Sequence, residues 1–306
     1  MGQPVNRVGT VALGLVAAVA AASLAGPRAL AAQAICSAPH SSPSLAQGGS
    51  IGTLPAGAGW VQLSLQGQRS TEGFNPSGAR QPFLGGSRFD TRSAYVTAAY
   101  GIAPGLEVWA QLPVHRLTAT GAAGRSEGSG LGDTRVALRV SPDLVGWSAP
   151  FAVRFGAKLP GTDLPVDARV LPLTEGQRDL EVSVESGWSP DALRAYVVAW
   201  VGYRWRSENE SERFRPGDER FAHAAVGGSV GLVSLQLGID ALWGLSPHDQ
   251  GLVLDGARRR LVQLVPTLGA DVGPGRLEVT TPIPLSGQNL PAGVGVGIGY
   301  RALWGL

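Results

Sequence analysis

The sequence predicts an all-β protein, an antiparallel up-and-down transmembrane β-barrel of about 12 strands. Three observations support this. Apolar and polar residues alternate with period two over many short segments, long and short links alternate between them, and no apolar run beyond the N-terminus could form a membrane-spanning helix. Since only helices and closed barrels satisfy the backbone inside a bilayer, strands remain the way to cross it.

The alternation is clearest in the middle of the chain. In GLEVWAQLPVHRL (residues 105–117) every second residue from Leu106 to Val114 is apolar, whereas Glu107, Gln111 and His115 fall on the opposite face. The segments 133–140, 151–159 and 179–188 repeat this pattern, with charged residues on the second face. Such segments are typical of half-buried strands.

The same criterion, applied along the chain, predicts strands near residues 58–68, 93–101, 105–117, 131–140, 150–160, 179–188, 193–206, 219–230, 233–243, 260–272, 275–285 and 293–306. Long links occupy residues 69–91, 118–130, 161–178, 207–218, 244–259 and 286–292, and short turns lie between them. Barrels of the outer membrane have short periplasmic turns, long outward loops and an even number of strands. The alternation therefore favours a membrane barrel over a soluble β-sandwich and places both chain ends on one side.

The N-terminus predicts export. Arg7 precedes the apolar run Val11–Gly26, and Ala32 and Ala34 are the small residues that a signal peptidase reads. We therefore expect a cleaved signal peptide at residues 1–34, a flexible leader rich in Ser, Pro and Gly at residues 35–57, and the transmembrane barrel at residues 58–306. The expected location is the outer membrane of a Gram-negative bacterium.

Composition excludes several classes of protein. The pI near 9.0 depends on Arg7 and Arg28 in the predicted signal; without these two, 23 of the 25 basic residues remain to face 23 acidic ones. A balanced charge gives no argument for nucleic-acid binding. The single cysteine, Cys36, excludes an internal disulfide framework and a Cys-based zinc site, and Ile35 before it argues against a lipoprotein.

The C-terminal segment GVGVGIGYRALWGL is a further sign of a barrel. Its apolar residues from Val294 to Leu306 share one face, and Gly293, Gly295, Gly297 and Gly299 share the other. This ending resembles the signal read by the barrel assembly machinery, with Leu306 in place of the usual aromatic residue. The glycine face would leave room for a loop, a plug or a solute. Aromatic residues near the predicted strand ends fit interfacial girdles.

One stretch of sequence resembles a known family. The hairpin YGIAPGLEVWAQLP, the motif Gly130-Leu131-Gly132-Asp133 at the start of the next strand, and a strand ending in KLPGTD are similar to outer-membrane transporters of the phenol meta-cleavage pathway. The resemblance is specific over residues 95–165, and LPLTEGQRD departs from the family's Gly-Thr-Gly turn. It implies a barrel that admits hydrophobic or aromatic compounds.

Charged residues on the second face are the candidate pore lining. Both signs occur, which predicts a wall of ion pairs or a wide wet lumen rather than a selectivity ring of one sign. Asp133 either contributes to a constriction or pairs with a neighbouring arginine and fixes strand register. The candidate lining residues are Asp133, Arg135, Arg139, Arg154, Lys158, Glu107, Glu181 and Glu185.

Two apolar loop segments, residues 82–86 and 251–256, would either plug the lumen, meet an apolar solute or pack together as a lid.

An enzyme is not expected. Acyl transfer requires a Ser and a His in hydrogen-bond reach with an orienting group. His40 lies in the leader and His248 in a loop, while His115 and His223 face inward without a diagnostic serine motif. The sequence contains no H-E-x-x-H or paired-Cys site, so we expect no metal and no cofactor.

The sequence therefore predicts a porin-like outer-membrane channel or transporter for small, hydrophobic or aromatic solutes. The alternatives are a structural or adhesive barrel without transport, a barrel enzyme and a soluble periplasmic sandwich. The expected partners are the lipid bilayer, the barrel assembly machinery during biogenesis and a small-molecule solute.

Overall fold

The computed structural model describes residues 53–305 except for positions 123, 162–172, 175, 190–194 and 211–212. The predicted signal at residues 1–34, most of the predicted leader, Cys36, His40 and Leu306 lie outside the described residues. No described helix has the length and apolar character needed to span a membrane.

The described residues form strands and three short 3-10 turns. Their bounds are β1 Gly59–Ser70, β2 Glu72–Phe74, β3 Arg80–Pro82, η1 Leu84–Gly86, β4 Arg88–Ala103, β5 Leu106–Gly121, β6 Gly124–Leu131, β7 Thr134–Val140, η2 Pro142–Val145, β8 Phe151–Leu159, β9 Asp179–Trp188, β10 Ala195–Arg206, β11 Phe214–Arg215, β12 Glu219–Val230, β13 Val233–Gly244, β14 His248–Asp249, β15 Leu252–Val253, η3 Asp255–Ala257, β16 Arg260–Val272, β17 Gly275–Thr280, β18 Ile283–Gln288, β19 Leu290–Pro291 and β20 Gly295–Trp304.

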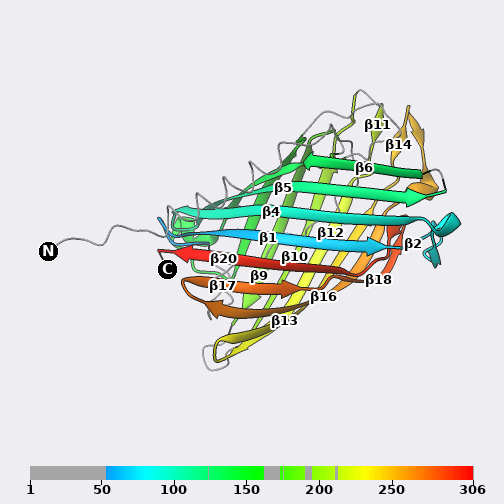
Figure 1. Cartoon of the computed structure of the whole chain (residues 1–306). Helices are drawn as coiled ribbons and strands as arrows, with labels where there is room; N and C mark the ends of the chain where they lie inside the picture. The colour runs from blue at the N-terminus through cyan, green and yellow to red at the C-terminus, as the bar shows by residue number, and fades with distance from the viewer. Residues whose placement is uncertain are drawn as a thin grey trace.

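Twelve of these strands close into an antiparallel barrel, in the order β1, β4, β5, β7, β8, β9, β10, β12, β13, β16, β17 and β20, with β20 returning to β1 (Figure 1). Each strand pairs with its neighbour in the sequence, as an up-and-down barrel requires. Two further strands, β6 and β18, pair with β5 and β16. The predicted fold class and its 12 strands are thus confirmed.

Two strands of the ring are interrupted toward the outer side. β6 and β7 both pair with β5, but only β7 pairs with β8; the break falls at Gly132 and Asp133. β17 and β18 both pair with β16, and Pro282 lies between them. Proline has no N–H to donate to a ladder, so an interruption there is expected.

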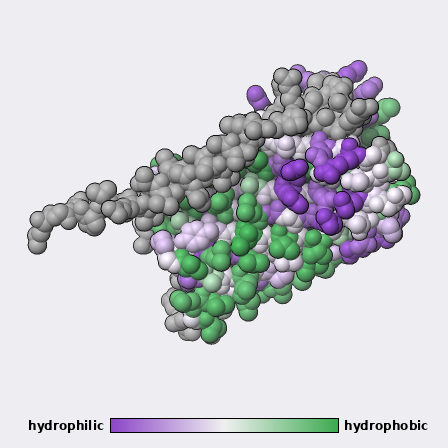
Figure 2. Space-filling view, viewed as in Figure 1, coloured by the Kyte–Doolittle hydropathy of each residue, from purple (hydrophilic) through white to green (hydrophobic). Residues whose placement is uncertain are grey.

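The two faces of the wall follow the predicted alternation. Outward positions are exposed and mainly apolar, as at Val108, Leu138 and Phe155, whereas inward neighbours such as Glu107, Arg139 and Arg154 are buried. In Figure 2 hydrophobic residues spread over much of the visible wall. The predicted inside and outside faces are therefore confirmed, and the apolar face is the one that contacts lipid in such barrels.

The outer ends of several strands extend beyond their predicted limits. β4 starts at Arg88, β5 continues to Gly121, and β6 occupies most of the stretch 118–130 that the sequence predicts as a loop. These extensions carry charged and small residues on both faces. Because they project above the apolar band, no hydrophobic alternation marked them as strands.

The two apolar loop segments neither plug the lumen nor pack together as a lid. Leu84 is 92% exposed and Leu252 is 71% exposed. Leu84 belongs to η1, beside β5, whereas Leu252 belongs to β15, between β13 and β16 on another part of the rim. The predicted plug and the predicted lid are therefore wrong, whereas contact with an apolar solute stays a prediction.

Candidate functional site in the barrel lumen

Seven of the eight predicted lining residues lie on inward faces of four neighbouring strands, and Asp133 lies just before one of them, at the break that precedes β7. β5, β7, β8 and β9 are adjacent in the barrel, and their inward side chains meet in register. The described part of the lumen contains ion pairs rather than a ring of charges of one sign. The residues concerned are Glu107, Asp133, Arg135, Arg139, Arg154, Lys158, Glu181 and Glu185.

Four of them form a compact group near the periplasmic end, here called the inner quartet: Glu107, Arg139, Arg154 and Glu185. Arg139 Nε lies 2.7 Å from Glu185 Oε2, and Arg139 Nη1 lies 3.2 Å from Glu107 Oε2. Arg154 Nη2 lies 2.7 Å from Glu185 Oε1, and its guanidinium stands 5.6 Å from the centre of the Trp109 ring. Each charge is therefore compensated, which burial requires.

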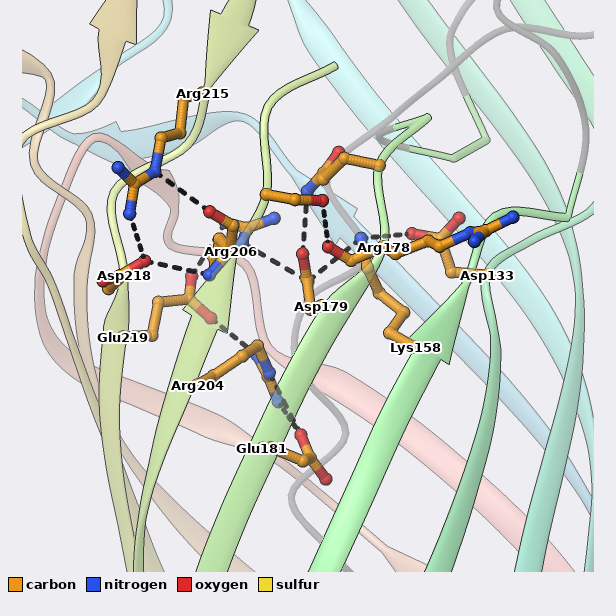
Figure 3. Close-up of polar contacts among 12 residues, drawn as sticks. Asp133, Lys158, Arg178, Asp179, Glu181, Arg204, Arg206, Arg215, Asp218 and Glu219 are labelled. Carbon is orange, nitrogen blue, oxygen red and sulfur yellow. Dashed lines mark hydrogen bonds and ion pairs between the residues drawn. The ribbon is translucent and has the colours of Figure 1, made fainter. Parts of the chain in front are cut away.

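A second network, here called the outer chain, runs from β7 across β8, β9, β10 and β12 nearer the outer rim (Figure 3). Lys158 Nζ bridges Asp133 at 2.8 Å and Asp179 at 3.2 Å. Arg206 joins Asp179 to Glu219 at 3.4 and 3.2 Å. Arg204 continues from Glu219 at 2.6 Å to Glu181 at 3.0 Å, and Arg135 is 3.8 Å from Glu181. Carboxylates and cations alternate, so no stretch of the chain presents a single sign.

Among the described residues, the ion-pair partner of Asp133 is a lysine rather than the neighbouring arginine that the sequence suggested. Lys158 on the adjacent strand makes this contact, whereas Arg135 reaches Glu181. The reason is geometric: Asp133 directly precedes β7, and Lys158 is the register partner of Arg135, two residues from Asp133 along the chain. The flexible lysine side chain spans this diagonal offset.

The outer chain includes residues that were not singled out from the sequence, namely Asp179, Arg206, Glu219 and Arg259. Asp179 lies an even number of residues from Glu181 and Glu185 and so shares their strand face, and Arg206 shares the face of Arg204 for the same reason. Strand phase alone would have found them. They were missed because they stand at strand ends, where the alternation fades into the loops.

The glycines of the Gly130–Asp133 motif allow close packing at the strand break. A Cβ added to Gly132 would lie 2.4 Å from His115 Cδ2, and one added to Gly161 would lie 2.0 Å from the Gly132 carbonyl oxygen. Gly132 N–H donates to the Pro113 carbonyl at 3.0 Å. The motif thus sets Asp133 beside Lys158 by letting backbone and imidazole approach more closely than side chains would permit.

A separate ion-pair group lies on β17 and β20. Glu278 contacts Arg301 at 3.2 Å and Arg276 at 3.6 Å. Arg301 also donates from Nε to Gln62 Oε1 at 3.0 Å and stands 5.2 Å from the centre of the Trp60 ring.

The inward glycine stripe of β20 does not leave free space. A Cβ on Gly299 would lie 2.8 Å from Gln62 Nε2 and 2.9 Å from Ser64 Oγ, and one on Gly297 would lie 3.2 Å from Gln66 Cγ. The side chains of β1 lie over the stripe and occupy the room. The expectation of space for a loop, plug or solute at these glycines is wrong for this reason.

Aromatic rings share the lumen with the charges. Trp60, Trp109, Trp200, Tyr196 and Phe221 are all buried and inward-facing. Trp200 stacks on His223 with ring centres 3.8 Å apart. The indole N–H groups of the three tryptophans have no hydrogen-bond partner within the described part of the chain. The lumenal side of the wall therefore contains buried aromatic rings as well as ion pairs, and the three indole N–H groups are shielded from solvent.

The inward histidines do not form a hydrolytic constellation among the described residues. His115 Nδ1 lies 2.7 Å from Ser93 Oγ, but its Nε2 has no hydrogen-bond partner. His223 Nδ1 contacts Asp240 Oδ1 at 2.5 Å, while Gln263 donates to the other carboxylate oxygen at 3.1 Å. No described group of three or more His, Cys, Asp or Glu residues is arranged to hold a metal ion.

Apolar side chains are buried at both ends of the lumen. At the periplasmic end, Leu54 packs with Trp60 and Trp109, and its N–H donates to Glu107 Oε2 at 2.9 Å. At the outer end, Leu173 is fully buried against Leu117 and Phe89. The ion-pair networks therefore lie between two apolar contacts.

The comparisons with known proteins agree with this architecture. No protein-family model and no curated protein matches the chain. Among solved structures, it is similar to the COG4313 outer membrane channel from Pseudomonas putida F1, at 18% identity and a TM-score of 0.70, over 87% of this chain and 100% of that one. The CymD monoaromatic hydrocarbon channel gives 9% identity and a TM-score of 0.44, over 83% and 90% of the two chains. The fold is that of a bacterial outer-membrane β-barrel. A lipid bilayer is its environment.

Proposed function

We propose that this barrel is a channel for small hydrophobic or aromatic solutes and not an enzyme. One observation carries the proposal: buried aromatic rings face the same lumen in which the described charges are mutually compensated. A ring of unpaired charges of one sign would select ions. A compensated wall that also contains aromatic side chains instead suits uncharged ring compounds.

The constriction in this proposal is formed by the inner quartet and the outer chain. The eight lining residues predicted from the sequence all belong to these two networks or contact them. The pore width and the electrostatic field at this constriction would be set by Asp133, Arg135, Arg139, Arg154 and Lys158. Since their charges cancel locally, the open pore should discriminate little between cations and anions.

The similarity to an outer membrane channel supports this proposal, as does the sequence resemblance to transporters of the phenol meta-cleavage pathway, which we propose as the family. The proposal includes removal of a signal peptide at residues 1–34 and insertion by the barrel assembly machinery.

The test combines two assays on the purified, reconstituted protein. Planar bilayers give conductance and ion preference, and liposomes loaded with a dye-coupled sensor give uptake of phenol and toluene compared with glucose. We expect small, weakly selective conductance and faster uptake of the aromatic compounds. No conductance and no uptake above empty liposomes would refute the transport proposal.

Two variants make the test specific to the lining. Glu107→Gln removes one carboxylate of the inner quartet and should shift ion preference toward anions. Asp133→Asn with Lys158→Met removes one charge of each sign from the outer chain and should leave ion preference near that of the wild type. If both variants behave alike, the lining assignment is wrong.

The alternative is a structural barrel without transport, and one observation favours it. Leu54 and Leu173 are buried at opposite ends of the lumen, as in a closed barrel. The same reconstitution separates the two proposals, because a structural barrel would pass neither ions nor aromatic compounds.

A further inference from the structure

The outward faces of four neighbouring strands change from apolar to basic at one height. The last apolar row joins Leu65, Ala94 and Val114 across β1, β4 and β5. The next outward row toward the loops contains Arg92 and Arg116. Five exposed or half-exposed arginines gather there with two carboxylates, and we call this set the arginine patch: Arg69, Arg88, Arg92, Arg116, Arg125, Asp90 and Glu127.

The two carboxylates do not neutralise the patch. Asp90 is shared by Arg69 at 2.6 Å and Arg88 at 2.7 Å. Glu127 is shared by Arg125 and by Arg116, the latter at 3.8 Å. Arg92 makes no ion pair with any described residue. The five arginines and two carboxylates leave a formal charge of +3.

Arg92 and Arg116 are direct cross-strand partners on the same face. Like charges placed opposite each other destabilise an antiparallel pair. An anion between the two guanidinium groups would remove this repulsion. Phosphate is well suited, because its oxygens accept paired N–H bonds from the planar guanidinium fork.

The patch lies at the level of the lipid headgroups. It follows directly on the apolar band, and the long loops and the strand extensions show that this is the outer side. Figure 2 shows hydrophilic residues gathered toward the outer ends of β4–β6, beside the hydrophobic surface. In a bacterial outer membrane the lipid facing this level is a phosphorylated glycolipid.

We propose that the arginine patch binds the phosphate groups of the outer-leaflet glycolipid, the bis-phosphorylated glucosamine headgroup of lipid A. Arg92 and Arg116 hold one phosphate between them, and Arg69, Arg88 and Arg125 flank it. The bound headgroup compensates the positive charge of the patch that Asp90 and Glu127 do not neutralise. This site is on the lipid-facing wall and is independent of transport through the lumen.

The barrel offers a matched control on another part of its rim. Arg220 and Arg260 are also exposed and outward-facing, and each is a register partner of Trp243 on β13. A tryptophan separates these two arginines, so they do not form a pair that could clamp one phosphate.

The experiment measures lipid binding to the full-length barrel in a zwitterionic detergent by native mass spectrometry. The ligands are lipid A with two phosphates, the same lipid after enzymatic dephosphorylation, and phosphatidylglycerol. We expect the wild type to bind the bis-phosphorylated lipid at least tenfold more tightly than either of the others. Arg92→Gln with Arg116→Gln should abolish that preference, and Arg220→Gln with Arg260→Gln should change affinity less than threefold.

Several outcomes would overturn the proposal. Equal weakening in the two double variants would mean that general positive charge is responsible. Equal binding of phosphatidylglycerol would indicate an unspecific anionic-lipid surface, and equal binding of the dephosphorylated lipid would exclude phosphate recognition. Unboiled gel mobility reports folding. If the double variant does not fold, Arg92→Gln alone serves, because it breaks no ion pair, and an unchanged affinity in that variant would refute the site.

Discussion

Removing Arg139 should destabilise the barrel more than removing any exposed charge. The side chain is 1% exposed and is the only described cation within ion-pair distance of Glu107. Arg139→Met keeps most of the volume but leaves Glu107 unpaired and Glu185 with Arg154 alone. Breaking a buried ion pair from one side costs about 3–5 kcal/mol, because an uncompensated charge stays buried.

The assay is urea unfolding in lipid vesicles, followed by tryptophan fluorescence and by unboiled gel mobility. Arg258→Met is the control, since its ion pair with Asp255 is exposed and such pairs contribute about 0–1 kcal/mol. Adding Glu107→Gln to Arg139→Met should restore at least about 2 kcal/mol, because every remaining charge of the quartet again has a partner. An Arg139→Met barrel as stable as the wild type, or no recovery in the double variant, would refute the reasoning.

Two further predictions concern the wall and the outer lumen. Val136 is exposed on the outward face and pairs with Ala110, midway along the apolar row from Leu106 to Val114. Val136→Arg therefore places a charge against lipid near the midplane and should cost about 2–4 kcal/mol, lowering the yield of folded barrel in membranes. Gln111→Ala on the inward face should fold normally, and equal yields would contradict the face assignment. Leu173→Ser should loosen the contact with Leu117 and Phe89 and raise conductance in planar bilayers, while Leu252→Ser in an exposed loop should not. Unchanged conductance in the Leu173 variant would show that this contact does not limit the pore.

The alternation predicted the fold well where strands cross the membrane. Strands such as β9 and β12 were predicted to the residue, because one face must be apolar against lipid and the other is polar toward the lumen. That contrast ends at the headgroups. The strand residues Arg88–Thr91 and Gly124–Gly130 were therefore predicted as loop, although backbone pairing continues through them.

Phase also predicted which charges face the lumen, but not which of them pair. Asp133 and Arg135 are close in sequence, yet they point to different partners on neighbouring strands. Register decides this, and register depends on bulges and breaks such as the one at Gly132. The glycine stripe of β20 shows the same limit, since its meaning depended on the side chains of β1, more than 200 residues away in the chain.

The pairing of β1 with β20 has a consequence for how the protein reaches its native state. Trp60 and Leu303 are register partners, so the seam joins the two most distant parts of the described chain. Closing this seam costs chain entropy, and the compensating contacts between β1 and β20 form only at the end. Folding is therefore slow and nearly all-or-none. Until that seam forms, two long strand edges stay unpaired and open to aggregation. A substitution that weakens β20 should thus lower the yield of assembled barrel well before it lowers the lifetime of barrels already closed.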